Sequence, residues 1–191
     1  MTETTSAIAL LLAAAIVALV VWALVPLLLR ILRQWGIFDR PNERSSHSAA
    51  TPKGGGLVVV PAVLGAWVIL FLWTPDTATG IFPVIAGAAL LAIVSWLDDL
   101  KDLPVAVRLL VQAGAVGLAL WGMAPTLPLL NGVVPLAVEI SVLALAWVWF
   151  INLFNFMDGI DGITAAETVS ICLGLSLVAL LQGWELADFG L

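Results

Sequence analysis

Two polar segments that follow hydrophobic stretches carry side chains able to do chemistry. The first contains two adjacent acids and a third close behind: Asp98, Asp99 and Asp102. The second repeats an amide or a carboxylate at every third position: Asn152, Asn155, Asp158 and Asp161. Carboxylates are costly near lipid, so their presence at these positions indicates a functional site. Amide and carboxylate oxygens are also the ligands that Mg²⁺ accepts, usually together with phosphate oxygens.

Both segments also have a purely structural interpretation. Asp98 and Asp99 can simply form a solvated helix end. Adjacent helix positions point about 100° apart, so the two acids do not chelate one ion together from a regular helix. In the second segment, Asn and Asp side chains near Gly159 and Gly162 can cap backbone N–H groups at a turn. Two acids and two amides exceed what one turn needs, which favours a ligand site there.

A third segment, residues 39–56, combines basic side chains, hydroxyls and a glycine run just before a predicted helix. Its candidate binding residues are Arg44, His47, Thr51 and Lys53. Because a helix N-terminus favours an anion, phosphate binding is one interpretation. A positively charged anchor with a flexible turn is the other. The spacing is not that of a Walker A loop, and His47, the only histidine, has no partner for a zinc site.

Two further charged residues lie in hydrophobic surroundings. Arg108 stands a few residues inside a predicted span, one turn before Gln112. Its guanidinium can make a bidentate contact with phosphate. Equally, its long side chain can snorkel to the membrane interface. Glu139 is the only acid expected deep in the membrane, where it is either protonated or closer to the outer interface.

The elements that must hold these residues are membrane-spanning helices. Hydrophobic residues make up 62% of the 191 residues and charged residues 10%, which excludes an ordinary soluble domain. Six stretches are long enough to cross a bilayer as helices: 7–29, 55–73, 80–97, 104–122, 133–151 and 163–182. The predicted fold is therefore all-α and integral to the membrane, a polytopic bundle of about six transmembrane helices in one domain, residues 1–191.

The distribution of basic residues predicts the orientation of the bundle. When residues 30–54 are placed in the cytoplasm, every basic residue falls on that side: Arg30, Arg33, Arg40, Arg44, Lys53, Lys101 and Arg108. The N-terminus is then outside, and the connections 98–103 and 152–162 are cytoplasmic. All three polar segments are thus expected at one membrane boundary, where a lipid head group and a soluble nucleotide can meet.

The first two segments resemble the signature motifs of the polyprenyl-phosphate N-acetylhexosamine-1-phosphate transferases, glycosyltransferase family 4. The matching patterns are Asp98-Asp99-x-x-Asp102 and Asn152-x-x-Asn155-x-x-Asp158-Gly159-x-Asp161-Gly162. Residues 40–56 resemble the bacterial O-antigen-priming branch of that family. The resemblance implies that undecaprenyl phosphate attacks the β-phosphorus of a UDP-N-acetyl sugar, with release of UMP and with Mg²⁺ or Mn²⁺ as cofactor. This reaction is a first membrane step of O-antigen or other cell-envelope polysaccharide synthesis.

The same resemblance implies a role for each matching position. The expected catalytic acids are Asp98, Asp99, Asp158 and Asp161. Asn155 and Asp99 are the expected metal ligands. The expected substrate-binding residues are Arg44, His47, Thr51, Lys53, Arg108 and Asn152.

The resemblance also implies partners and a location. The partners are undecaprenyl phosphate, a UDP-N-acetyl sugar and the lipid bilayer, with no nucleic acid, and a homodimer is compatible with this reading. The location is the bacterial inner membrane, with a multi-pass chain and an active site that faces the cytoplasm. Family members usually have more spans and further cytoplasmic loops, so residues 1–191 are expected to be the N-terminal part of a longer transferase.

Two other classes of membrane protein remain as alternatives. A CDP-alcohol phosphatidyltransferase requires Asp-Gly-x-x-Ala-Arg, and the segment from Asp161 to Ala166 lacks the arginine. A cation transporter or a noncatalytic scaffold is the second alternative. A transporter would more naturally carry polar groups at mid-membrane depth, where Glu139 is the only candidate.

Overall fold

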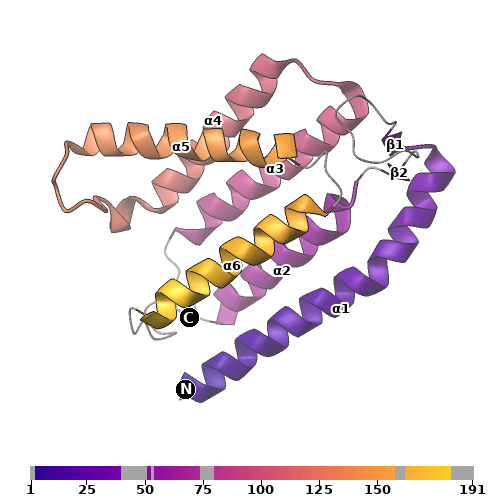
Figure 1. Ribbon diagram of the computed structural model, residues 1–191, viewed down its shortest axis with the longest axis horizontal. Coiled ribbons are helices and arrows are strands. Elements are labelled where there is room, and N and C mark those ends of the chain that lie inside the picture. Colours follow the sequence, from indigo (N-terminus) through magenta and orange to yellow (C-terminus); the bar gives the residue numbers. More distant parts are fainter. Residues whose placement is uncertain (1–2, 40–50, 53, 74–79, 158–161, 182–191) are drawn as a thin grey trace.

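The computed structural model describes residues 3–39, 51–52, 54–73, 80–157 and 162–181, and these form a bundle of helices (Figure 1). The helices are α1 (Glu3–Trp35), α2 (Gly56–Trp73), α3 (Ile81–Lys101), α4 (Val105–Gly122), α5 (Leu136–Met157) and α6 (Ile163–Leu181). A short 3₁₀ helix, η1 (Ala124–Thr126), follows α4. The expected all-α membrane bundle is confirmed, because each of the six helices overlaps one of the six predicted spans.

Four of the helices are long and apolar enough to cross a membrane: α1, α3, α4 and α5. The described parts of α2 and α6 form shorter apolar helices, Gly56–Leu72 and Ile163–Val178. At 33 residues, α1 is about 50 Å long and exceeds the hydrocarbon core of about 30 Å. Its last turn carries Arg33, whose charge is favourable at a helix C-terminus. The apolar span found within it is Leu12–Trp35.

The ends of α3 and α5 differ from the sequence prediction, which placed residues 98–103 and 152–162 in connections. Asp98 to Lys101 instead form the last turn of α3, and Asn152 and Asn155 lie on the last turns of α5. Polar residues continue a helix readily once it leaves the lipid, because the backbone bonds of the preceding turns propagate it. α3 ends where Asp102 adopts a left-handed conformation, with φ of 49°, and Pro104 follows two residues later.

A short antiparallel ribbon was not predicted from the sequence. It consists of β1 (Phe38–Asp39) and β2 (Thr51–Pro52), with Phe38 opposite Pro52 and Asp39 opposite Thr51. In Figure 1 the ribbon lies beyond the C-terminal end of α1, close to the start of α2. It therefore holds residues 51 and 52 of the third polar segment next to the membrane-spanning bundle.

The closest packing in the bundle joins α3 and α4 as an antiparallel hairpin. A Cβ atom on Gly87 would lie 2.8 Å from the carbonyl oxygen of Ala115, so the two backbones nearly touch at this level. Gly80 and Gly122 make a similar backbone contact at the other end of the hairpin. Small residues at facing positions allow this approach, which is a common way to pack helices where lipid gives no hydrophobic driving force. Most of the buried side chains of the described residues belong to α4: Ala115, Val116, Ala119 and Leu120.

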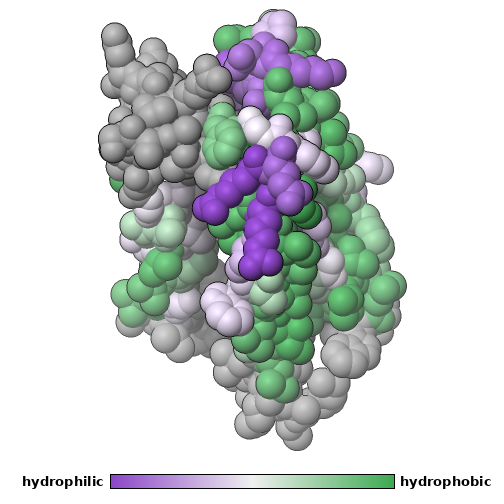
Figure 2. Space-filling view, turned by 90° about the vertical axis from the view of Figure 1, so that its right-hand side faces the viewer, coloured by the Kyte–Doolittle hydropathy of each residue, from purple (hydrophilic) through white to green (hydrophobic). Residues whose placement is uncertain are grey.

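The other helices are arranged around this hairpin. α2 packs against α3 and α1, α5 packs against α4, and α6 contacts α5. Long apolar side chains remain exposed along every helix, as expected for a surface that faces lipid. Figure 2 shows hydrophilic side chains gathered in the upper half of one face, while hydrophobic ones cover much of the rest. Polarity is therefore concentrated toward one end of this face.

We expect Gly87→Ala to destabilise the bundle by about 1–3 kcal/mol, because the added methyl group collides with the backbone of α4. Gly114→Ala is the matched control on α4, since a Cβ there meets no atom within 4 Å. That control should be neutral or stabilising by up to about 1 kcal/mol through helix propensity. Thermal unfolding of both variants in detergent micelles measures the difference. Equal stability of the two variants would contradict the close approach of α3 and α4.

Candidate active site at the ends of helices α3, α4 and α5

Asp98 clamps the turn that joins α3 to α4. Its Oδ1 accepts a hydrogen bond of 2.8 Å from the backbone N–H of Leu103. Its Oδ2 accepts a second one of 2.9 Å from Nη1 of Arg108. The two side chains are only partly exposed, 22% for Asp98 and 36% for Arg108. The arginine therefore meets a carboxylate of its own hairpin, an outcome that neither interpretation of the sequence included.

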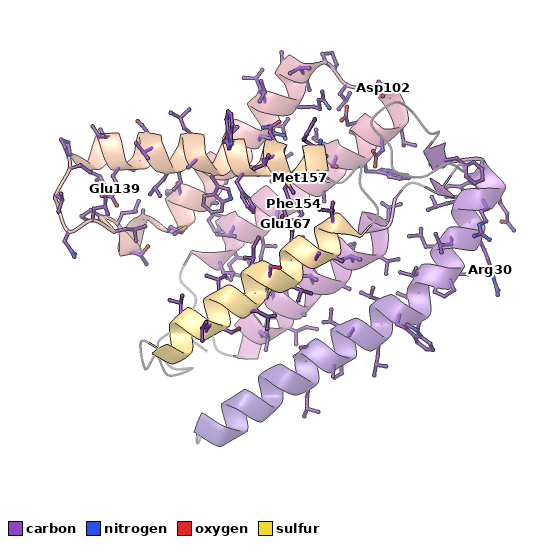
Figure 3. All side chains as sticks on the ribbon, in the orientation of Figure 1. Arg30, Asp102, Glu139, Phe154, Met157 and Glu167 are labelled. Atoms are coloured by element: carbon purple, nitrogen blue, oxygen red, sulfur yellow. The ribbon has the colours of Figure 1, made fainter. Side chains whose placement is uncertain are left out.

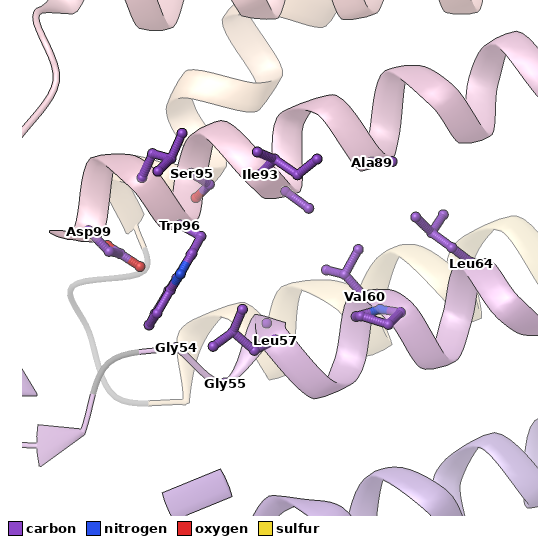
Figure 4. A pocket seen from close by; sticks show the side chains of 14 residues that line it. Gly54, Gly55, Leu57, Val60, Leu64, Ala89, Ile93, Ser95, Trp96 and Asp99 are labelled. Atoms are coloured by element: carbon purple, nitrogen blue, oxygen red, sulfur yellow. The ribbon is translucent and has the colours of Figure 1, made fainter. Parts of the chain in front are cut away.

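Asp99, the next residue, turns toward a different helix. Successive helix positions are about 100° apart, so the two acids cannot face the same partner. Asp99 lines a pocket between α2 and α3, together with the glycine run Gly54–Gly56 (Figure 4). The two adjacent acids thus face different helices: Asp98 faces α4, and Asp99 faces α2.

The glycine run is held against α3 by an aromatic ring. Gly54 has φ of 110°, and a Cβ on it would lie 2.7 Å from Cζ3 of Trp96. Trp96 lies between the glycines and Asp99 in the close-up of the pocket (Figure 4). This contact requires glycine for both its backbone conformation and its lack of a side chain. The end of the third polar segment is therefore placed within one helical turn of the acid pair.

An amide pair connects α4 to α5 on the same side of the molecule. Nδ2 of Asn152 donates to Oε1 of Gln112 at 2.7 Å, and Nε2 of Gln112 donates to Oδ1 of Asn152 at 3.5 Å. Nδ2 of Asn152 also donates to the carbonyl oxygen of Val148 at 2.8 Å. These bonds engage both ends of the Asn152 amide. Asn155, which is exposed, lies three residues further along on a neighbouring part of the helix surface.

The structure fully describes five of the predicted site residues: Asp98, Asp99, Arg108, Asn152 and Asn155, which come from three helices. It joins Asp98 to Arg108 and holds Asn152 against Gln112, whereas Asp99 faces α2 and Asn155 is exposed on α5. Thr51 is described only through its backbone in β2. Five predicted residues lie outside the described part of the chain: Arg44, His47, Lys53, Asp158 and Asp161. Their roles stay predictions.

Two residues of this region were not predicted as part of a site. Gln112 follows Arg108 by four positions and therefore shares its helix face, which is the signal that could have identified it. Trp96 carries no comparable signal, because an aromatic residue near a span end is common in membrane helices. Its role depends on contact with a glycine 42 positions earlier in the chain, and only the folded structure supplies that contact.

Glu139 lies at the opposite end of the bundle, in the first turn of α5 (Figure 3). It is 3% exposed, and its Oε1 accepts the backbone N–H groups of Leu129 and Leu130 at 2.6 and 3.3 Å. Its Oε2 is buried and has no hydrogen-bond partner among the described residues. The carboxyl group therefore ties the connection between α4 and α5 to the start of α5.

The donor set favours a hard divalent cation over a transition metal. The oxygens of Asp99 and Asn155 suit Mg²⁺, which prefers carboxylate, carbonyl and phosphate oxygens. No group of three His, Cys, Asp or Glu residues that could hold a metal occurs within the described ranges. A complete cation site would thus need further oxygens from amides, from substrate phosphates or from the segment with Asp158 and Asp161, which lies outside those ranges.

Comparison with known protein families identifies the family of this chain. Residues 81–190 match the family model of glycosyl transferase family 4. The match covers more than half of the chain, and the chain belongs to this family. The resemblance seen in the sequence motifs is thereby confirmed.

Individual relatives agree with this assignment. The chain is 35% identical over 135 residues to the undecaprenyl-phosphate alpha-N-acetylglucosaminyl 1-phosphate transferase of Yersinia pestis, an alignment that covers 67% of this chain and 36% of the relative. It is 29% identical over 163 residues to the protein of that name from Escherichia coli, covering 82% and 42%. It is 30% identical over 190 residues to the phospho-N-acetylmuramoyl-pentapeptide-transferase of Thermosynechococcus vestitus, covering 86% and 48%. The chain thus spans less than half the length of these relatives, and no solved structure matches it.

We expect Arg108→Gln and Asp98→Asn each to destabilise the hairpin by about 1–3 kcal/mol, because each leaves a partly buried charge without its partner. The double variant should lose clearly less than the sum of the two, since the second change removes nothing that the first has left intact. Thermal unfolding in micelles of the unchanged protein, the two single variants and the double variant measures this double-mutant cycle. Arg30→Gln, an exposed position on α1, is the control. Additive losses would exclude the ion pair.

Proposed function

We propose that this protein transfers a sugar-1-phosphate from a UDP-N-acetyl sugar to undecaprenyl phosphate and releases UMP. The observation that carries the proposal is the convergence of acids, amides and Arg108 from three helices at one end of a membrane bundle. Family membership supports it, and so do the names of relatives that act on undecaprenyl phosphate. Synthesis of O-antigen or another cell-envelope polysaccharide is the proposed context.

The proposed phosphoryl transfer depends more on the positioning of the reacting groups than on a strong base. A phosphate monoester near neutral pH is already ionised, so the lipid phosphate can attack the β-phosphorus of the UDP-sugar directly while UMP leaves. Arg108, held by Asp98, offers N–H donors to one of the phosphates. Asp99 and Asn155 would hold Mg²⁺, which supplies charge neutralisation at the transferring phosphoryl group. Asn152, fixed by Gln112, is proposed to orient the substrate.

The proposed location is the cytoplasmic face of the bacterial inner membrane. The orientation that places every basic residue on one face places the candidate site on that face too. The positive-inside rule makes that face cytoplasmic. UDP-sugars are soluble and polar, so a site at this boundary would receive them from the cytoplasm. The lipid phosphate would arrive from the membrane.

The rival classes account for fewer of the observations. A cation transporter needs polar groups along a path through the membrane. Glu139, the acid that the sequence suggested for such a path, instead binds backbone amides at the end opposite the site. A CDP-alcohol phosphatidyltransferase needs the arginine that is absent after Asp161-Gly162. A noncatalytic scaffold gives no reason for the shared position of the acids, the amides and Arg108.

Release of UMP by the purified protein tests the proposed reaction. The assay contains undecaprenyl phosphate, Mg²⁺ and, in separate samples, UDP-N-acetylglucosamine and other UDP-N-acetyl sugars. Release that requires the lipid phosphate supports the proposal and identifies the sugar. EDTA should abolish it, and Mg²⁺ or Mn²⁺ should restore it. Release that is unaffected by EDTA would overturn the proposed cofactor.

We expect Asp99→Asn to lower the rate of UMP release by about 10²–10³-fold, because a charged group that positions the phosphates or the cation is lost. Lys101→Gln is the matched control, since it changes an exposed charge on the same turn of α3. Its rate should stay close to that of the unchanged protein. Retained activity in Asp99→Asn would remove this residue from the proposed site.

A cysteine-labelling experiment tests the proposed orientation. In a Cys172→Ser background, Lys101→Cys should react with a membrane-impermeant maleimide only from the cytoplasmic side. Val133→Cys, 83% exposed near the start of α5, should react only from outside. Intact cells and inverted membrane vesicles give the two directions of access. The reverse pattern would place the candidate site on the outer face.

A further inference from the structure

The last two turns of α1 carry a polar patch of three exposed side chains: Arg30, Arg33 and Gln34. Because Arg33 and Gln34 follow Arg30 by three and four positions, all three lie on one face of the helix. The two arginines are the only charged residues of the apolar span Leu12–Trp35. Figure 3 shows the side chain of Arg30 directed away from the bundle. The end of this span therefore presents two positive charges to its surroundings.

The polar patch lies on the side of α1 that the rest of the protein does not use. Leu32 is fully buried, and α1 packs against α2 and β2. Arg30 and Gln34 are about 160° from Leu32 around the helix axis, because successive positions are about 100° apart. No residue in the described part of the chain makes a hydrogen bond or an ion pair with either guanidinium. Their N–H donors are therefore available to a molecule outside the protein.

An exposed apolar surface continues from the patch along the same face of α1. Leu27 precedes Arg30 by three positions, while Leu19 and Trp22 precede Arg30 and Arg33 by 11, which is close to three helical turns. All three apolar side chains are more than half exposed. Figure 2, which views the side of the molecule that carries the end of α1, shows hydrophilic side chains above hydrophobic ones. The face thus joins a cationic end to an apolar length of about 16 Å, roughly half of the hydrocarbon core of a bilayer.

We propose that this face of α1 is a binding site for an anionic phospholipid. The phosphate group lies at the two arginines and the Gln34 amide, and the acyl chains lie along the exposed apolar side chains. A guanidinium donates paired hydrogen bonds to two oxygens of a phosphate, and basic residues beside a membrane span attract anionic head groups. The inference does not rest on the proposed function, because neither arginine belongs to the candidate site.

Charge and shape favour this occupant over water, a free phosphate ion or a zwitterionic lipid. A single arginine at the end of a span can reach water by snorkelling, but two on neighbouring positions of one face repel each other. An anion between them relieves that repulsion. A free phosphate would leave the apolar part of the face without a contact. A zwitterionic phospholipid would bring an ammonium group next to the two arginines.

Photolabelling of the full chain in phosphatidylcholine vesicles tests the proposal. The probe is a trace of phosphatidylglycerol with a diazirine on one acyl chain. Mass spectrometry should find the label enriched on residues 19–34 relative to the other spans. Replacement of part of the phosphatidylcholine by unlabelled phosphatidylglycerol should remove this enrichment, and replacement by phosphatidylethanolamine should not.

Three results of this experiment would overturn the proposal. Equal removal of the label by the two phospholipids would show that the face does not select an anionic head group. Removal by inorganic phosphate in the buffer would show a site for a free anion. Stronger removal by undecaprenyl phosphate than by phosphatidylglycerol would show a preference for a lipid with a single chain.

Substitution of the arginines provides a second, independent arm. Arg33→Gln should lower the enriched labelling by about fivefold, and the further change Arg30→Gln should lower it again by a similar factor, since each removes one basic group at the membrane surface. Both positions are exposed, so the fold should persist, which thermal unfolding in micelles checks. Lys101→Gln is the matched control, because it removes one exposed positive charge from α3. Equal labelling of Arg33→Gln and Lys101→Gln would contradict the inference.

Discussion

The close approach of α3 and α4 is the constraint on which the rest of the site depends. Gly87 and Ala115 bring the two backbones almost into contact, which fixes how far one helix can slide past the other. That register places Arg108 opposite Asp98 and brings the N–H of Leu103 to the same carboxylate. α5 then packs on α4, and the Gln112–Asn152 amide pair fixes the second motif relative to the first. A loosened hairpin would therefore disturb every described part of the site.

Lipid as the surrounding solvent explains why most charged side chains of the described residues lie near the ends of the helices. Backbone groups within the spans are satisfied by the helices themselves, and exposed aliphatic side chains cost nothing there. Polar groups gather where water is available, and most are engaged with one another. At the far end, Glu139 collects two backbone N–H groups and so organises the connection between α4 and α5. The two ends of the bundle therefore differ: one stabilises the connection between α4 and α5, and the other carries the acids, the amides and Arg108.

The adjacent acids of the first motif show how helix geometry can separate two roles. Because neighbouring positions point about 100° apart, Asp98 faces α4 and Asp99 faces the pocket beside α2. Asp98 acts in the structure as a clamp that holds an arginine in place. Asp99 lines the pocket between α2 and α3, together with the glycine run. In the proposed reaction the first acid would act through Arg108, and the second would act near the phosphates.

The sequence by itself determined the fold class, the six helices and the family, because hydrophobic length and short polar motifs are local properties of the chain. It also predicted that Asp98, Asp99, Arg108, Asn152 and Asn155 share one membrane boundary, which stays a prediction. It misjudged the ends of α3 and α5, where polar residues continue the helix, and it did not predict the ribbon of β1 and β2. Only the tertiary structure decided that Arg108 pairs with Asp98, that Gln112 holds Asn152 and that Trp96 covers Gly54. Those contacts depend on helix register and on packing between distant segments, which no local pattern of residues encodes.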